Sequence, residues 1–376
     1  METGSGTMGA WVLEQAAPLE DARLTFRWRT DRPRPRPGPG EVLVEVATCG
    51  VCHTDLHTVE GELPLPAPGG IPGHQVVGRV VETAPDATEV CPPPGIDPGL
   101  AGALLAAAGQ PGTDTWQLRP GTRVGVAWLY DACGRCPACL RGEENLCPQA
   151  RFTGLSVPGG YAEALTAPAR YLVPLPARFD DVRAAPLLCA GIIGYRSLRL
   201  AGVGPDRPRT LGLWGFGASA HLALQLARHW GCRVYVFTRS AAHRALALRL
   251  GAAWAGAAGD PPPEPLEAGI TFAPVGRLIP QALAALAPGG VLAINAVHLQ
   301  DGIPAFDYRL LYGERVLRSV ANATRRDAWE WMYWADQAGV EPEVERWPMS
   351  QAREALVRVK AAAVQGSAVL VRGGDS

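Results

Sequence analysis

The chain carries almost no net charge and contains no long apolar run, and both absences limit what it can be. Lysine and arginine number 35 and aspartate and glutamate 36, so the formal net charge is −1 at pH 7. Nothing in this balance favours nucleic acid binding. No apolar stretch is long enough to span a bilayer. No hydrophobic secretory leader precedes the fold, so we expect a reducing cytoplasm, where cysteine thiols stay available for metal.

The length and the texture of the chain indicate two domains. With 376 residues, 47% of them hydrophobic, it exceeds the usual size of a single core. Up to about Pro186 short apolar runs alternate with Pro and Gly turns, which is typical of an irregular, mostly β domain. Strand and helix patterns then alternate, which predicts a parallel sheet with helical crossovers. We predict an α/β fold with a mostly β domain of residues 1–187 and 321–376 and a doubly wound parallel sheet in residues 188–320.

One stretch of the first domain differs from its surroundings. Residues 86–118 combine prolines, glycines and alanines without a sustained amphipathic period. We interpret this segment as a surface insertion, with one helical turn near residues 100–108.

The strongest motif is a cluster of four cysteines in the run CGRCPACLRGEENLC. Two residues separate each of the first three cysteines, so one tight loop can present three sulfurs to a single point, and a longer gap brings in the fourth. Disulfides are the alternative, but the other five cysteines are scattered. A zinc ion held by four thiolates has no open position for substrate, so this site is predicted to be structural. Its ligands are Cys133, Cys136, Cys139 and Cys147.

A glycine pattern predicts a dinucleotide site. Gly215, Gly217 and Ala220 lie between a predicted strand and a predicted helix, which is the context that the GxGxxG/A fingerprint requires. The helix N-terminus would then face the pyrophosphate. By itself the pattern is weak, and an ordinary strand-to-helix turn is the alternative.

The end of the next strand favours NADP over NAD. An NAD enzyme would place an acidic residue there for the ribose hydroxyls, whereas this chain has Thr238, Arg239 and Ser240. An arginine attracts a 2′-phosphate and a carboxylate repels it. His243 and Arg244 are possible helpers. The alternative is that the two arginines are solvated surface charges.

A second metal site is predicted from residues far apart in the sequence. Cys52, His74 and Cys189 would supply two thiolates and one imidazole, which leaves a fourth position for water or substrate. Each residue alone is more often a structural cysteine or a satisfied histidine, so the prediction depends on their joint appearance.

These motifs together resemble the zinc-dependent alcohol dehydrogenases of the medium-chain dehydrogenase/reductase (MDR) family. The blocks CGVCHTDLH and LLCAG flank the four-cysteine loop in the family's order, and the likeness runs from Trp11 to Leu370 apart from the insertion. The resemblance implies a GroES-like catalytic domain and a Rossmann domain with a cleft between them. It also implies that Cys52, and not Cys49, is the ligand in CGVC.

The resemblance assigns further roles around the catalytic zinc. Thr54 would hydrogen-bond the substrate oxygen and pass its proton through the cofactor ribose to His57. Asp55 would orient the histidine ligand, and His53 would lie near the pyrophosphate. Gln75 replaces the glutamate that follows the histidine ligand in most relatives.

Two more positions depart from the family's pattern, and a third residue would compensate for one of these differences. Ile193 stands where relatives often have threonine, and Ser367 where many have an arginine that contacts the pyrophosphate. Arg325, in ANATRRD, would partly replace that arginine.

The expected reaction is hydride transfer between NADP(H) and a primary alcohol or its aldehyde, with two zinc ions per chain. Trp128 resembles an aromatic wall of the substrate pocket, and its alternative is a plain core residue. A polyol or sugar substrate is the second interpretation, and a catalytically silent nucleotide-binding scaffold is the third. Relatives associate through an edge of the Rossmann sheet, so we expect a homodimer or homotetramer with residues 291–311 at the contact.

Overall fold

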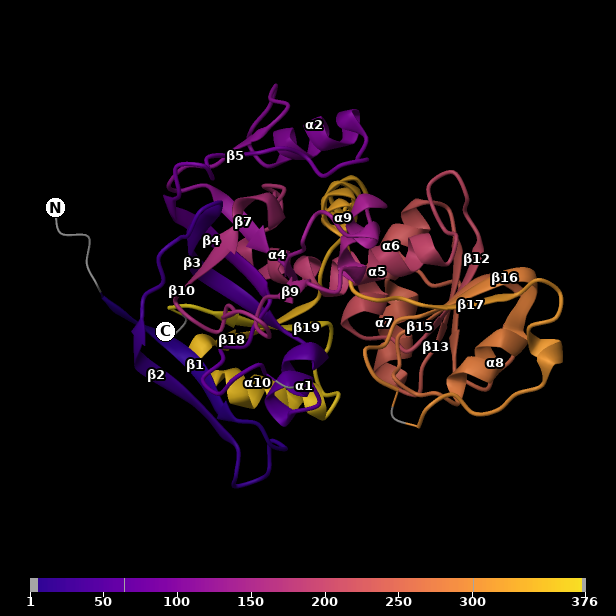
Figure 1. The fold of residues 1–376 in the computed structure, drawn as a ribbon. Helices are drawn as coiled ribbons and strands as arrows, with labels where there is room; N and C mark the ends of the chain where they lie inside the picture. Colours follow the sequence, from indigo (N-terminus) through magenta and orange to yellow (C-terminus); the bar gives the residue numbers. More distant parts are fainter. Residues whose placement is uncertain (1–5, 64, 300, 374–376) are drawn as a thin grey trace. The chain divides into compact units, whose positions relative to one another are not determined.

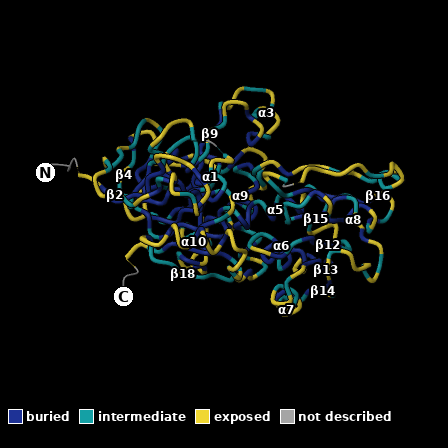
Figure 2. The backbone as a smooth tube through the Cα atoms, turned by 90° about the horizontal axis from the view of Figure 1, so that it is seen from below, coloured by how far each residue is buried: buried dark blue, intermediate teal, exposed yellow. Residues whose placement is uncertain are grey.

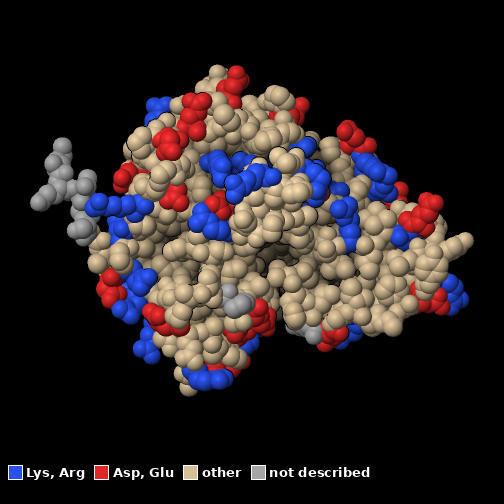
Figure 3. Space-filling model, viewed as in Figure 1, with Lys and Arg blue, Asp and Glu red and all other residues tan. Residues whose placement is uncertain are grey.

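A computed structural model of the protein describes residues 6–63, 65–299 and 301–373. The chain forms two compact units (Figure 1). Unit 1 comprises Met1–Cys189, Ala323–Asp336 and Pro342–Ser376, and unit 2 comprises Ala190–Asn322 and Gln337–Glu341. Within the described residues, no helix combines the length and the apolar character needed to cross a bilayer. Both basic and acidic side chains are present on the face seen in Figure 3, and several of the basic ones gather near its upper middle.

Unit 1 is built on a seven-stranded sheet in the order β11-β7-β4-β3-β19-β18, with β10 on β3. The pairs are antiparallel except β18 with β19. Because β19 pairs with β3, the C-terminal strand β19 joins β18 to the strands from the first half of the chain (Figure 1). The strands are β3 (Glu41–Val51), β4 (Gln75–Thr83), β7 (Arg123–Val126), β10 (Ala164–Pro168), β11 (Leu172–Val173), β18 (Val344–Pro348) and β19 (Ser367–Val371).

Smaller elements surround this sheet. Two-stranded pairs are β1 (Thr7–Gln15) with β2 (Thr25–Pro33), β5 (Glu89–Val90) with β6 (Trp116–Gln117), and β8 (Leu129–Asp131) with β9 (Arg151–Phe152). The α-helices are α1 (His53–Glu60), α2 (Pro98–Ala107), α3 (Pro137–Leu140), α4 (Asp181–Ala184), α9 (Arg325–Gln337) and α10 (Ala352–Lys360). Short 3₁₀ helices are η1 (Glu144–Leu146), η2 (Ala169–Tyr171), η3 (Ala185–Leu188) and η5 (Met349–Gln351).

Unit 2 is a six-stranded parallel sheet in the order β14-β13-β12-β15-β16-β17. The first strand lies in the middle and the order reverses beside it, which is the doubly wound arrangement. The predicted fold class is therefore confirmed. The strands are β12 (Thr210–Trp214), β13 (Arg233–Phe237), β14 (Trp254–Gly256), β15 (Leu266–Thr271), β16 (Leu286–Ile294) and β17 (Val316–Ser319). The helices are α5 (Ala190–Leu200), α6 (Ala218–His229), α7 (Ala241–Arg249), α8 (Leu278–Ala285) and the 3₁₀ helix η4 (Tyr308–Leu310).

An aromatic layer fixes the end of β12, next to the glycine-rich turn. The Trp214 ring stacks on Phe237 with the ring centroids 4.5 Å apart. A Cβ atom added at Gly212 or Gly269 would come within 2.7 Å and 2.9 Å of that indole, so only glycine leaves room for it. The central strands β12, β13 and β15 are buried along most of their length, whereas the edge strand β17 is mostly exposed (Figure 2).

The insertion contains a longer helix than the single turn expected. Its helix α2 spans ten residues. Asp97 caps it, since its side chain accepts a hydrogen bond from the Leu100 N–H at 2.9 Å. Leu104 and Leu105 are fully buried, and Trp116 packs edge to face on Trp329 of α9. Tertiary burial therefore orders a segment whose sequence has no amphipathic period.

Candidate active site and metal centres

The pairing of β3 with β4 brings two of the predicted catalytic ligands together. Gly50 pairs with Gln75, so Cys52 just after β3 lies beside His74 just before β4. The Cys52 Sγ atom is 3.5 Å from Nε2 of His74. Cys189 follows η3, and its sulfur lies within 4.8 Å of both other ligand atoms. Three residues from distant parts of the sequence thus face one point within unit 1.

Asp55 holds this cluster in place from behind. It is the third residue of α1, and its Oδ2 accepts a hydrogen bond from the Cys52 N–H at 3.0 Å. Its Oδ1 accepts one from the Gly73 N–H at 3.2 Å and lies 2.9 Å from Nδ1 of His74. With Nδ1 occupied by the carboxylate, Nε2 is the nitrogen directed at the two sulfurs.

Charge around the cluster favours a cation. Burial opposes the charged form of His74, but Asp55 and Cys52 outweigh it and raise its pKa to about 10. A hydrogen bond with Cys189, followed by burial, raises the pKa of the Cys52 thiol well above its usual range. Two thiolates at this distance repel each other, and a metal ion between them removes that cost. The donor set fits zinc with one position open.

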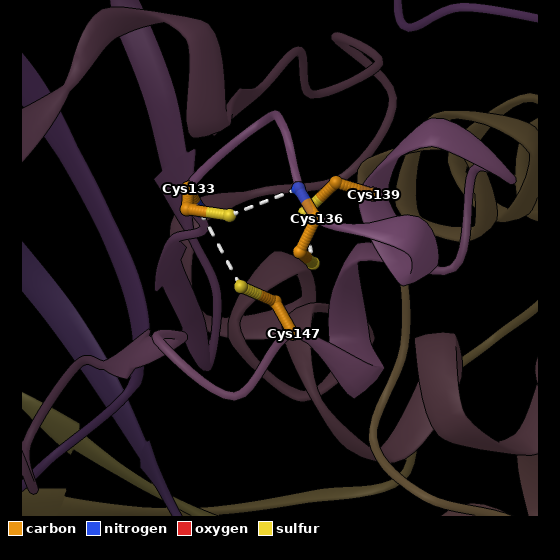
Figure 4. A group of neighbouring side chains, drawn as sticks. All are labelled: Cys133, Cys136, Cys139 and Cys147. Atoms are coloured by element: carbon orange, nitrogen blue, oxygen red, sulfur yellow. Dashed lines mark hydrogen bonds between the residues drawn. The ribbon is translucent and has the colours of Figure 1, made fainter.

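The four-cysteine loop forms a separate cluster (Figure 4). The Cys136 and Cys139 sulfurs are 3.6 Å apart, and all four sulfurs lie within 4.8 Å of one another. A tetrahedral site with Zn–S bonds of about 2.3 Å needs sulfurs about 3.8 Å apart. All four are free thiols, so no disulfide competes with this arrangement.

Backbone N–H groups prepare these thiols for metal. The Cys136 N–H donates to Cys133 Sγ at 3.3 Å, and the Cys133 N–H donates to Cys147 Sγ at 3.5 Å. Hydrogen bonds from the Arg135 and Cys136 backbone lower the pKa of the Cys133 thiol to about 6. The lowered pKa favours the thiolate of Cys133, which is the form that binds zinc. Burial, followed by a hydrogen bond with Cys136, instead raises the pKa of the Cys139 thiol to about 12.

Helix α1 carries the predicted proton-transfer residues next to the catalytic cluster. Thr54 and His57 are three positions apart on the helix, so their side chains are neighbours. The Thr54 N–H donates to Cys52 Sγ at 3.4 Å. Nδ1 of His57 contacts the carboxylate of Glu62. His53 is exposed, and its ring centroid lies 6.3 Å from that of His57.

Trp128 and Gln75 border the cluster. The Trp128 ring meets His74 edge on at 4.8 Å and stacks on Phe152 at 5.2 Å. Trp128 is half-buried. Gln75 is buried against Gly50, where an added Cβ would lie 2.9 Å from the Gln75 side chain. Its Nε2 has no hydrogen-bond partner among the described residues.

The glycine-rich turn of unit 2 has the geometry that the fingerprint predicts. Gly215 has a φ of 91°, and a Cβ there would lie 2.8 Å from the Ala273 nitrogen, so this turn requires glycine. Gly217 is the N-cap of α6, and an added Cβ there would meet nothing within 4 Å, which leaves the helix N-terminus open to a ligand. Ala220 is fully buried.

The residues predicted to choose the cofactor follow β13 directly. Thr238 is buried, Arg239 is exposed, and the Ser240 hydroxyl caps α7 by accepting from the His243 N–H at 3.2 Å. Nη1 of Arg244 donates to the carbonyls of Thr238 and Arg239 at 2.8 and 3.0 Å. Two guanidinium groups therefore lie at the carboxyl end of the strand.

Comparisons with known proteins decide the family. The profile of the "Alcohol dehydrogenase GroES-like domain" matches residues 38–93 and 100–177, and that of the "Zinc-binding dehydrogenase" family matches residues 220–335. A "Probable alcohol dehydrogenase AdhA" of Mycobacterium tuberculosis is 45% identical over 98% of both chains. An alcohol dehydrogenase of Geobacillus stearothermophilus is 35% identical over 88% of this chain and 91% of the relative.

The chain belongs to the zinc-dependent alcohol dehydrogenases of the MDR family. The fold agrees: the cinnamyl alcohol dehydrogenase of Sorghum bicolor superposes with a TM-score of 0.79 over 97% of both chains, at 24% identity. The protein is thus an alcohol dehydrogenase-type oxidoreductase that acts on small molecules.

In this dehydrogenase Arg325 forms an ion pair with Glu144. Its Nε and Nη2 donate to both carboxylate oxygens of Glu144 at 2.8 to 3.0 Å, and its guanidinium stacks over Tyr171 at 4.8 Å. Glu144 belongs to η1 inside the four-cysteine loop, so the pair ties that loop to the start of α9. Ser367 is buried in β19, and Ile193 lies on α5.

The sequence did not indicate three partners of the site. Glu62 contacts His57, and Glu144 binds Arg325 across 181 positions. Tyr161 is fully buried against Gly73, where an added Cβ would lie 2.4 Å from its ring. Only the contact of Glu62 with His57 could have been predicted locally, since Glu62 follows α1 by two residues and can fold back against that helix.

Proposed function

We propose that this protein catalyses zinc-dependent hydride transfer between NADP(H) and a primary alcohol or its aldehyde. The observation that carries the proposal is the convergence of Cys52, His74 and Cys189 on one point beside Trp128. Two thiolates and one imidazole fit zinc with a position left for substrate oxygen. The indole beside His74 offers an apolar wall for an aliphatic or aromatic group.

Each residue of the proposed site has its own role in the reaction. When bound, zinc supplies a Lewis acid for the substrate oxygen and NADP(H) supplies or accepts the hydride. Asp55 keeps His74 in the tautomer that binds metal. Thr54 lies two residues after the ligand Cys52 and hydrogen-bonds the substrate hydroxyl. It accepts the substrate proton while it donates its own hydroxyl proton toward His57, which is the final acceptor. His53 and Gln75 are assigned supporting roles near the pyrophosphate and behind the metal.

NADP is the proposed cofactor because of the charge after β13. Thr238, Arg239 and Ser240 offer hydroxyls and a cation where a carboxylate would select NAD. Arg244 adds a second cation held by the carbonyls of Thr238 and Arg239. Gly215, Gly217 and Ala220 form the proposed pyrophosphate turn. For Arg325 a cofactor contact stays a prediction.

The reaction is tested with a panel of aliphatic, aromatic and polyol alcohols and their carbonyl products. We expect turnover of primary alcohols with NADP and loss of activity on chelation. Faster turnover of sorbitol than of benzyl alcohol would instead support a polyol dehydrogenase. Cofactor binding without turnover by zinc-loaded protein would support a silent scaffold.

The cofactor choice is tested by Arg239→Ala. Losing one charge next to the 2′-phosphate is expected to raise the KM for NADPH about tenfold, since tenfold corresponds to about 1.4 kcal/mol. The KM for NADH should change little. Equal effects on both cofactors would overturn the assignment.

We further propose two zinc ions per chain, one in each cluster, and a cytoplasmic location that keeps the six ligand thiols reduced. Zinc analysis of the purified protein should give a value near two. We keep residues 1–187 with 321–376 as the catalytic domain and residues 188–320 as the nucleotide-binding domain.

For the assembly we propose a homodimer or homotetramer formed through the β17 edge of unit 2. β17 is an edge strand, and exposed large hydrophobic residues gather near it. They are Val297, Ile303, Tyr308, Tyr312 and Val316. A monomeric mass by light scattering at micromolar concentration would contradict this proposal.

A further inference from the structure

The end of α1 turns the chain back onto the proposed proton acceptor. Gly61 closes the helix with a φ of 89°, and its N–H donates to the Thr58 carbonyl at 3.3 Å. The Leu63 N–H then donates to the His57 carbonyl at 3.0 Å. This turn places the carboxylate of Glu62 on Nδ1 of the His57 ring.

We propose that Glu62 is a positioning residue for proton transfer, acting through His57. This inference rests on the proposed function. A carboxylate on Nδ1 holds the proton of a neutral imidazole on that nitrogen, so Nε2 keeps its lone pair and accepts the proton that leaves the substrate. The same carboxylate stabilises the imidazolium that results. Without Glu62 the His57 ring can rotate or adopt the other tautomer. Nε2 then no longer offers a lone pair to the proton that leaves the substrate.

The exposure of the two side chains fits a route from the site to water. The His57 side chain is 21% exposed and that of Glu62 is 52% exposed. The pair therefore reaches from the partly buried face of α1, which carries Thr54, to solvent. The other carboxylate near the end of the helix, Glu60, is already engaged by Lys360 and by the Leu19 N–H. The other titratable ring close by is His53, with its centroid 6.3 Å from that of His57.

The proton balance is simple. In the direction of alcohol oxidation the substrate loses one proton and one hydride. The hydride passes to NADP⁺, which leaves as NADPH. The proton leaves the substrate oxygen through Thr54, which gains one proton and gives up another, and the relay ends on Nε2 of His57. His57 then releases one proton to water and returns to the neutral form. Glu62 gains and loses no proton in this balance and is not consumed.

The test compares Glu62→Ala, Glu62→Gln and Glu62→Asp in the zinc-loaded enzyme. The readout is the rate of NADPH formation in a single turnover, because slow product release then cannot hide the effect. Losing the hydrogen-bond partner of a metal-ligating histidine typically costs 10- to 100-fold, and we expect a similar cost for the partner of His57. We expect a fall of at least about tenfold for Glu62→Ala. Glu62→Gln should fall less, because its amide oxygen still accepts the Nδ1 hydrogen, and Glu62→Asp should recover part of the rate.

Two further readouts separate positioning from a structural role. The KM values for alcohol and NADP should stay within about twofold of wild type, and the solvent deuterium isotope effect should rise in the slow variants as proton transfer becomes limiting. Glu14→Gln, an exposed carboxylate on β1, is the matched control and should behave as wild type.

The possible failures are distinguishable. A wild-type rate in Glu62→Ala, or a loss that appears only in KM or in the melting temperature, would overturn the role of Glu62. An inactive wild type with two bound zinc ions would instead overturn the proposed function.

Discussion

The two thiolate clusters of unit 1 are built in opposite ways. The cluster of Cys133, Cys136, Cys139 and Cys147 comes from one loop, and its sulfurs receive hydrogen bonds from the backbone of that loop. The cluster of Cys52, His74 and Cys189 joins three remote segments at the end of a sheet. Its histidine is fully buried and tied to the buried carboxylate of Asp55.

This difference shows what each cluster depends on. The loop supplies all its ligands from one segment, so the zinc proposed there would contribute mainly to folding stability. The dispersed cluster depends on the β3–β4 register, on η3 and on Asp55, and the zinc proposed there would keep one position open. On this proposal, local construction accompanies a structural role and dispersed construction a chemical one.

The largest effect is expected for His74→Ala. Removing the buried imidazole should empty the dispersed cluster and lower kcat/KM by at least about 10³-fold, since a Lewis acid supplies several kcal/mol and each 1.4 kcal/mol is tenfold. Zinc content should fall from two to one per chain, with circular dichroism unchanged. Residual activity of His74→Ala above one percent of wild type would contradict the catalytic role of the dispersed cluster.

The complementary change is Cys136→Ser in the loop. Zinc content should again fall to one, but here the melting temperature should drop by about 10 °C or more, because lost metal binding is lost folding free energy. At low temperature the protein that remains folded should keep kcat within about threefold. A loss of kcat without loss of stability would contradict the structural role.

The loop and the dispersed cluster also differed in how far the sequence predicted them. The spacing of the four cysteines fixed their site by itself, and alternating strand and helix patterns predicted β12, α6 and β13. Cys52, His74 and Cys189 were predicted only from their joint appearance, because no local spacing links them, and the choice of Cys52 over Cys49 needed the resemblance. The pairings of Glu144 with Arg325 and of Tyr161 with Gly73 were not predictable, since they join positions far apart through the packing of unit 1. The α2 helix was underestimated because burial of Leu104 and Leu105, and not periodicity, stabilises it.

A smaller effect is expected for Asp55→Asn. The amide cannot hold His74 as the charged carboxylate does, so zinc affinity and kcat should each fall about 10- to 100-fold. Metal competition with a chelator measures the first and alcohol turnover the second. If only the melting temperature changed, Asp55 would be a helix cap and not a support for the metal ligand.

The smallest effect is expected for Glu144→Gln, the carboxylate that adjoins the other cluster. Glu144 and Arg325 are mostly buried, with side chains 11% and 22% exposed, so breaking their ion pair should cost about 2 kcal/mol. For a domain of this size that corresponds to a fall of about 4 to 8 °C in melting temperature. Zinc content and kcat should not change, because Glu144 orients no ligand and instead fastens the loop to α9. Asp55 and Glu144 are both buried carboxylates beside a thiolate cluster, so a change in kcat for Glu144→Gln would show that the loop also serves the chemistry.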